Sequence, residues 1–244
     1  MQKWRPALDA KWSLIAVNKN DLRIDWATHE AARFACENWH YSRSIPKSKL
    51  VKIGVWEKGR YIGVVLFSYG ATPDLVKPYG LKMNEGCELT RVALAKHETA
   101  VSRIMSIALK FLKKSNPGLR IVVSFADTNE GHHGGIYQAT NWVYTGTSQG
   151  CFFFKDKNGK IWHPRNVSEN LSLSGKVIKP SDCEKVWKSG KHRYLMPLDD
   201  AMRKQIQSLA KPYPKRVTSA DSGTLGNPAE KGRCNSDRNA FEAK

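Results

Sequence analysis

The apolar positions between residues 28 and 150 recur with two periodicities, one typical of strands and one typical of helices. Two runs rich in Val, Ile and aromatic residues flank Glu57-Lys58-Gly59-Arg60 and predict a hairpin. Residues 87–94 alternate in polarity and predict a further strand. After His97 the apolar residues recur at helical spacing, and Asn116-Pro117-Gly118 ends this predicted helix.

The next apolar run, residues 119–125, has the length of a strand and is followed by Asp127. A strand, a helix and a second strand in this order predict a parallel crossover. A short helix over residues 136–140 and a strand beginning at Trp142 follow. The pattern therefore predicts an α/β fold with a mixed central sheet flanked by helices.

The flanking regions give weaker signals. Thr28 is a candidate N-cap for a helix reaching Asn38. Asp156-Lys157-Asn158-Gly159 predicts a second hairpin, and residues 193–198 and 199–209 predict a last strand and helix. We expect one domain over residues 1–210, with a core at 28–150 and a basic C-terminal extension at 151–210. Residues 211–244 have the composition of a disordered tail.

The charge is strongly one-sided, with 40 Lys and Arg against 22 Asp and Glu and a formal net charge of +18. Such a surplus favours a polyanionic partner, and residues 151–198 alone hold 10 basic and 4 acidic residues. No run of 18 apolar residues and no signal-peptide pattern occurs, so we expect no membrane partner and a cytoplasmic location. The five cysteines form no metal framework and are expected to be reduced thiols.

Five stretches can be taken together: His40–Lys47, Cys87–Leu94, Ser124–Asp127, Gly131–Ala139 and Lys191–Leu198. In their order and spacing they resemble the Mom proteins of phages. The block from Cys87 to Ser148 resembles acyl-CoA-dependent N-acyltransferases of the GNAT fold. Within that block, Gly135–Trp142 is similar to the GNAT segment that carries a tyrosine before an aromatic strand. The resemblance implies a GNAT-like fold.

The Mom resemblance implies an enzyme that converts adenine to N6-carbamoylmethyladenine in double-stranded DNA and so protects phage DNA from host restriction. A phage or prophage would encode it, and it would act in the host cytoplasm. The implied cofactor is acetyl-CoA or a related acyl donor, with Thr99, Ser102, Arg103 and Ser124 as candidate contacts. One departure is that His97–Arg103 lacks the glycines with which GNAT enzymes cradle a pyrophosphate.

The candidate catalytic residues are Glu88, Arg91, Asp127 and Tyr137. Glu88 and Arg91 lie three apart on one predicted strand and are expected on opposite faces. Asp127 follows a strand at the edge where α/β sheets place their sites, and its alternative role is a turn cap. Tyr137 matches the GNAT tyrosine that protonates a leaving thiolate, and its alternative role is that of a core aromatic.

His40 and Tyr41 are expected to line a pocket for an extruded base, while Arg43, Lys47 and Lys49 are expected to contact phosphates. His40, Asp127, His132 and His133 are candidate ligands for iron or another divalent metal, although their spacing matches no metal motif. The oligomeric state stays open, a homodimer being one alternative.

Two other functions fit parts of the pattern. One is a conventional N-acetyltransferase acting on a small amine or an RNA, and the other is a basic DNA-binding protein that has lost catalysis. The net charge disfavours the small-amine enzyme, because sites for amines are usually acidic. The presence of both Asp127 and Tyr137 disfavours the inert binder.

Overall fold

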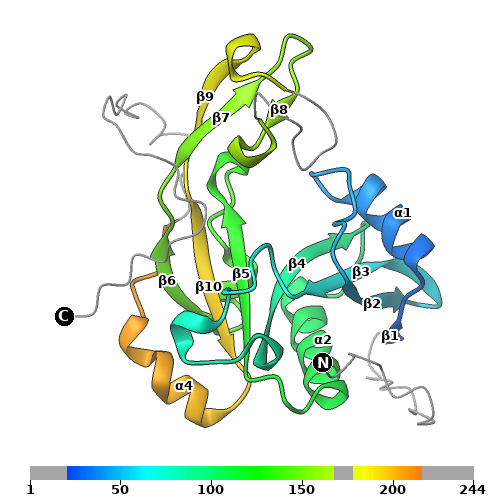
Figure 1. The fold of residues 1–244 in the computed structure, drawn as a ribbon. Coiled ribbons are helices and arrows are strands. Elements are labelled where there is room, and N and C mark those ends of the chain that lie inside the picture. The colour runs from blue at the N-terminus through cyan, green and yellow to red at the C-terminus, as the bar shows by residue number, and fades with distance from the viewer. Residues whose placement is uncertain (1–20, 168–177, 216–244) are drawn as a thin grey trace. The chain divides into compact units, whose positions relative to one another are not determined.

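A computed structural model describes residues 21–167 and 178–215 of the chain. Its largest element is a seven-stranded mixed sheet with the order β1-β2-β3-β4-β5-β10-β6 (Figure 1). Neighbours from β1 to β4 are antiparallel, whereas β4 and β5 are parallel, as the predicted crossover requires. The elements in chain order are β1 Leu22–Trp26, α1 His29–Trp39, β2 Leu50–Glu57, β3 Arg60–Ser68, β4 Gly86–Leu94, α2 Val101–Ser115, β5 Ile121–Asp127, α3 Gly135–Gln138, β6 Val143–Thr147, β7 Cys151–Lys155, β8 Ile161–Trp162, β9 Glu184–Lys188, β10 Lys191–Pro197 and α4 Asp200–Ile206.

The predicted α/β class with a mixed sheet is therefore confirmed. The expected helices, both hairpins and the strands of the crossover are all present within a few residues of their predicted limits. The strands β1 and β9 were not predicted from the sequence. Each is only five residues long, which gives a period-two pattern little room to show.

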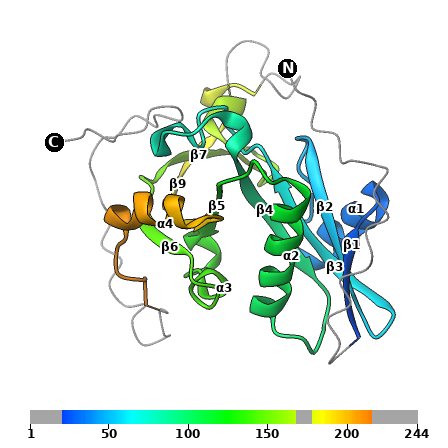
Figure 2. The same ribbon diagram turned by 90° about the horizontal axis from the view of Figure 1, so that it is seen from below.

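Helices α1 and α2 cover opposite faces of the antiparallel part of the sheet (Figure 2). Thr28 caps α1 by accepting a hydrogen bond from the Ala31 amide at 3.2 Å, as the sequence predicted. The small side chains of α1 then pack against Val64 and Leu66 of β3. On the other face, Phe111 of α2 contacts the ring of Trp26 at 4.9 Å between centroids.

The chain divides into two compact units, which are described separately below. Among the described residues, the main unit comprises residues 21–125, Gly134–Thr145 and Tyr194–Tyr213, and the small unit comprises Ala126–His133, residues 146–167, residues 178–193 and residues 214–215. This division differs from the expected core at 28–150 and extension at 151–210. The reason is that β10 returns to the large sheet between β5 and β6, so residues far apart in sequence fold together.

The long segment between β3 and β4 is held by packing within the main unit. It contains 3₁₀ turns at Lys77–Tyr79 and Met83–Glu85. Val76 and Tyr79 are buried in a cluster with Met202 and Ile206 of α4. The apolar residues of this segment therefore belong to the core of the main unit.

The small unit is built on a three-stranded antiparallel sheet with the order β8-β7-β9. Its hairpin closes where predicted, because the Asp156 carboxylate accepts hydrogen bonds from the Asn158 and Lys160 amides at 2.9 and 3.0 Å. Gly159 takes a positive φ of 79° in this turn, a conformation that glycine adopts without strain.

The residues after Ala210 begin with an ordered segment. The Tyr213 hydroxyl donates to the Trp142 carbonyl oxygen at 2.6 Å, and its ring stacks beside Tyr194. The first residues of the predicted tail thus pack on the main unit, while residues 216–244 lie outside the described residues. In the described part, no helix is long and apolar enough to cross a membrane.

Candidate active site

Two hydroxyl groups meet inside the main unit. Ser124 on β5 donates to either the Leu89 carbonyl oxygen or the Tyr137 phenol oxygen, each 2.9 Å from its Oγ. Ser124 is buried and Tyr137 is 8% exposed. Because water is nearly excluded, the hydrogen bond between the two hydroxyl groups is strong. It holds them in place beside Leu89 of β4.

The phenol of Tyr137 stays protonated near neutral pH. Burial raises the pKa of Tyr137 to about 12, against a smaller lowering by the hydrogen bond from Ser124. The nearby Tyr41 and Glu88 also disfavour its ionised form. Tyr137 can therefore act as a proton donor or hydrogen-bond donor, and not as a base.

The backbone at Gly134 lets Tyr137 reach this position. Gly134 has a φ of 83° and precedes α3, and a Cβ there would collide with the ring of Tyr194. Without that Cβ, Tyr194 lies 4.9 Å from the Tyr137 ring, and Trp142 lies 5.0 Å away on another side. The phenol is thus oriented by an aromatic cluster, which we call the tyrosine cluster: Tyr137, Trp142, Tyr144, Tyr194 and Tyr213.

A β-bulge corrects the expected placement of Glu88 and Arg91. Leu66 pairs with Arg91, but Phe67 pairs with Leu89, so Thr90 has no partner of its own in the ladder. The extra residue returns Glu88 to the face that carries Arg91. The expectation of opposite faces was wrong, because it assumed an uninterrupted strand.

This shared face is the one that α1 covers. Arg91 donates to the Thr90 carbonyl oxygen at 2.8 Å, and among the described residues its buried Nε has no hydrogen-bond partner. Burial raises the pKa of the Cys36 thiol on α1, and the positive charge of Arg91 opposes that rise. Glu88 is close enough to influence Tyr137. The structure thus brings Glu88, Ser124 and Tyr137 into one neighbourhood.

The segment after α1 uses its polar groups largely on itself. His40 is buried, and its Nδ1 accepts from the Ser42 amide at 3.1 Å and contacts the Ser42 hydroxyl at 2.8 Å. Its ring lies 4.3 Å from that of Tyr41, which is exposed. Stacking on the exposed Tyr41 ring is therefore open to a ligand, whereas His40 acts as its support.

The three basic residues of this segment differ in availability. The Arg43 guanidinium donates to the carbonyl oxygens of Glu37 and Asn38 at 3.1 and 2.6 Å and so closes the end of α1. Lys47 and Lys49 are exposed, and within the described ranges neither forms an ion pair. The phosphate role expected for Arg43 competes with its helix cap, while the two lysines are available for it.

Asp127 belongs to the small unit and is not the unpaired carboxylate that the sequence suggested. It lies 2.9 Å from the Lys191 ammonium and accepts from the Asn129 amide at 3.1 Å and from its side chain at 3.0 Å. Burial opposes ionisation, but Lys191 and Asn129 outweigh it and hold the pKa of Asp127 below its ordinary value. Its carboxylate therefore caps the turn Thr128–Glu130, the alternative that the sequence left open.

The expected metal ligands are divided between the two units. His40 belongs to the main unit and Asp127, His132 and His133 to the small unit. Among the residues at 21–167 and 178–215, no three His, Cys, Asp or Glu side chains are arranged to hold a metal ion. Cys36 and Cys87 are free and buried, as expected of core thiols.

The expected cofactor contacts are only partly available. The Glu57 carboxylate, which the sequence did not single out, accepts from the Thr99 hydroxyl at 2.6 Å and from the amides of Glu98 and Thr99 at 2.9 and 2.8 Å. Burial would raise the pKa of Glu57, but these hydrogen bonds lower it to about 2. Since an internal carboxylate already takes these donors, Thr99 does not fit a diphosphate, and only Ser102 and Arg103 stay partly exposed at this end of α2.

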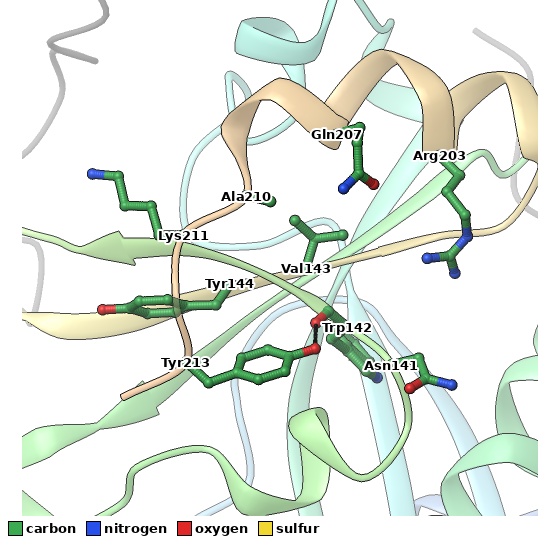
Figure 3. Close-up of a pocket in the computed structure, with 9 residues that line it drawn as sticks. All are labelled: Asn141, Trp142, Val143, Tyr144, Arg203, Gln207, Ala210, Lys211 and Tyr213. Carbon is green, nitrogen blue, oxygen red and sulfur yellow. Dashed lines mark hydrogen bonds between the residues drawn. The ribbon is translucent and has the colours of Figure 1, made fainter. Parts of the chain in front are cut away.

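A separate pocket of about 420 Å³ lies in the main unit between β6 and the segment after α4. Figure 3 shows the hydrogen bond from Tyr213 to Trp142 on one side and the side chains of Arg203 and Gln207 on the other. Arg203 and Lys211 are its cations, and its lining includes no carboxylate. None of the candidate residues from the sequence lines this pocket.

Comparison with known proteins gives the family. Residues 21–215 match the Mom protein family. The methylcarbamoylase Mom of Escherichia phage Mu is 26% identical over 220 residues, covering 85% of this chain and 90% of that protein.

Solved structures with a similar fold are acetyltransferases. The spermidine/spermine N-acetyltransferase SpeG from Vibrio cholerae has a TM-score of 0.41 at 11% identity, covering 77% of this chain and 95% of that one. A probable acetyltransferase of the GNAT family from Chromobacterium violaceum has a TM-score of 0.43 at 10% identity, covering 81% and 92%. The order β4-α2-β5-α3-β6 in a mixed sheet is the order of strands and helices that the sequence predicted for residues 87–147.

Proposed function

Because the chain belongs to the Mom protein family, we propose that it is a transferase that converts adenine to N6-carbamoylmethyladenine in duplex DNA. In this role it would protect phage DNA from host restriction. The relative in phage Mu is named a methylcarbamoylase, which supports the transfer of a group that contains a carbamoyl unit. The net charge of +18 supports a polyanionic substrate.

The observation that carries the proposal is the buried Ser124–Tyr137 hydroxyl pair. In the reaction, the N6 amine of adenine forms a bond to the CH₂ carbon of an activated carbamoylmethyl donor, and the proton that the amine loses is assigned to the Glu88 carboxylate. The bond from that carbon to the leaving group breaks, and the leaving group keeps its electron pair. Tyr137, protonated at neutral pH, is assigned the proton donation to the leaving group.

The remaining assignments place polar groups around the base. Tyr41 offers an exposed ring for stacking, and Lys47 and Lys49 offer charges to phosphates. Glu88 and Arg91 share one face, where a carboxylate can accept from the adenine amine. No donor is assigned to the start of α2, because Glu57 occupies the amides that a diphosphate would need.

The test is mass spectrometry of nucleosides from cells that express the protein. We expect N6-carbamoylmethyladenine from the wild type. A yield of N6-acetyladenine alone would favour a conventional acetyltransferase, and DNA binding without any modified base would favour an inert binder. Either result contradicts the proposal.

Asp127 is tested by a matched pair of variants. Asp127→Asn removes the charge, and Lys191→Met removes only its ion-pair partner. If Asp127 takes part in proton transfer, Asp127→Asn should lower the yield by about 10²–10⁴ and Lys191→Met far less. Equal losses in both variants would show that Asp127 acts by holding the turn, and would remove it from the catalytic set.

A further inference from the structure

One face of the small sheet is almost entirely aromatic. Residues paired across neighbouring strands point to the same face, and here Phe152 pairs with Trp187 and Phe154 pairs with both Lys185 and Trp162. Because β7 alternates, Phe153 lies on the opposite face. We call the first surface the aromatic face, and its rings are Phe152, Phe154, Trp162 and Trp187.

Two rings of the aromatic face are open to solvent. Phe152 is 43% exposed and Trp187 is 39% exposed, and they contact each other edge to face at 5.0 Å between centroids. Trp162 is fixed beside them, since the Lys160 ammonium lies 4.0 Å from its ring centroid and its indole N–H donates to Asp156 at 2.8 Å. Trp162 is therefore held in place, and the face presents flat apolar surface that the described residues of the small unit leave exposed.

The charges on this face suit a phosphate backbone. Lys185 is exposed on the same face as Phe154, and in the described part of the chain it has no ion-pair partner. Asp156, the acidic residue at the end of the face, is held by the turn and by Trp162. On the opposite face, Lys155 lies 3.4 Å from Glu184 and is neutralised.

From this arrangement we infer that the aromatic face is a second DNA-binding site, which stacks unpaired bases of the DNA while Lys185 contacts their phosphates. Exposed rings beside lysines form the platforms on which proteins bind single strands without regard to sequence. A closed duplex hides the faces of its bases, so the occupant is a strand already opened. The inference rests on the proposed function, because extruding an adenine leaves unstacked bases next to it.

Binding to a fluorescent 15-nucleotide single strand, without any donor present, tests the inference. Phe152→Ala combined with Trp187→Ala should weaken binding by about 10-fold or more, since stacking on each ring contributes appreciably to affinity. Ile161→Ala is the matched control, because Ile161 is also 43% exposed and pairs with Lys155 on the opposite face. Equal affinities in the double variant and the control would overturn the inference.

A second measurement on the unmodified protein guards against misfolded variants. A single strand that carries 5-iododeoxyuridine should cross-link under long-wavelength ultraviolet light to Phe152 or Trp187, as located by peptide mass spectrometry. Cross-links confined to other residues would refute the site. So would a change in self-association of the double variant at unaltered DNA affinity, which would identify the face as a protein interface.

These measurements separate the inference from the proposed function. They need no chemical step, so stacking can be found in a protein that modifies no adenine. Conversely, a protein that makes the modified base and binds single strands equally well without Phe152 and Trp187 would keep its function and lose this site.

Discussion

Both units of the protein gather aromatic side chains, but they expose them differently. In the main unit, Tyr137, Trp142 and Tyr194 are buried and lie within 5.0 Å of one another through Tyr137. In the small unit, Phe152 and Trp187 contact each other at the same distance and stay open to solvent. Burial shifts the acidity of a phenol and fixes its position, whereas exposure leaves a ring free to stack on a ligand.

The carboxylates of the two units differ in a parallel way. Glu57 of the main unit is stabilised by three neutral donors, the Thr99 hydroxyl and two backbone amides. Asp127 of the small unit is stabilised by its hydrogen-bonded ion pair with Lys191, whose side chain is half exposed, and by two hydrogen bonds from Asn129. Glu57 thus relies on neutral hydrogen bonds, which salt screens little, whereas Asp127 relies in part on a partly exposed charge that salt can screen.

The largest expected effect comes from removing the phenol of the tyrosine cluster. Tyr137→Phe should lower the yield of modified adenine by about 10²–10⁴, the usual loss for a general acid. Stability should fall by only about 1 kcal/mol, because one hydrogen bond to Ser124 is lost. Nucleoside mass spectrometry and thermal melting measure the two effects. Tyr144→Phe is the control within the same cluster, and normal yield from Tyr137→Phe would show that its ring alone matters.

The second largest effect should be on the free energy of unfolding, which should differ between variants of the tyrosine cluster and variants of the aromatic face. Trp142 is fully buried, so Trp142→Ala should cost about 3–5 kcal/mol in the free energy of unfolding. Phe152→Ala should cost less than about 1 kcal/mol, because its ring is 43% exposed. Urea unfolding of each variant measures this difference. Similar losses would mean that the aromatic face packs as a core and is not a free platform.

Acid sensitivity should separate the carboxylates. The pKa of Glu57 is lowered from 4.5 to about 2, so its contribution to stability is complete above pH 4.5 and is lost as the pH falls toward 2. That contribution is at most about 3 kcal/mol, from the size of the shift. Melting temperatures between pH 6 and pH 2.5 should therefore fall more steeply for the wild type than for Glu57→Gln. Parallel curves would contradict the buried hydrogen-bonded carboxylate.

Ionic strength provides the internal control for that experiment. Added salt should change the pH profile of the wild type little where Glu57 dominates, because its partners carry no charge. Lys191→Met removes the charged partner of Asp127 and serves as the comparison in the small unit.

Local patterns in the sequence were enough to predict most of the helices and strands and the family, although they missed β1 and β9. Apolar spacing predicted α1, α2 and both hairpins, because side-chain periodicity follows directly from helix and strand geometry. Thr28 and the Asp156–Gly159 turn were predictable because caps and turns depend on a few adjacent residues. The order of the five stretches predicted the Mom family. The surplus of Lys and Arg over Asp and Glu predicted a polyanionic partner.

The tertiary structure alone decided which distant residues meet. Glu57 and Thr99 are 42 positions apart, and Asp127 and Lys191 lie on strands separated by most of the small unit. The bulge at Thr90 exists only as a mismatch between two strands, so no pattern within β4 could reveal that Glu88 and Arg91 share a face. Pairing between strands depends on how whole elements pack, and single-strand periodicity carries no information about it.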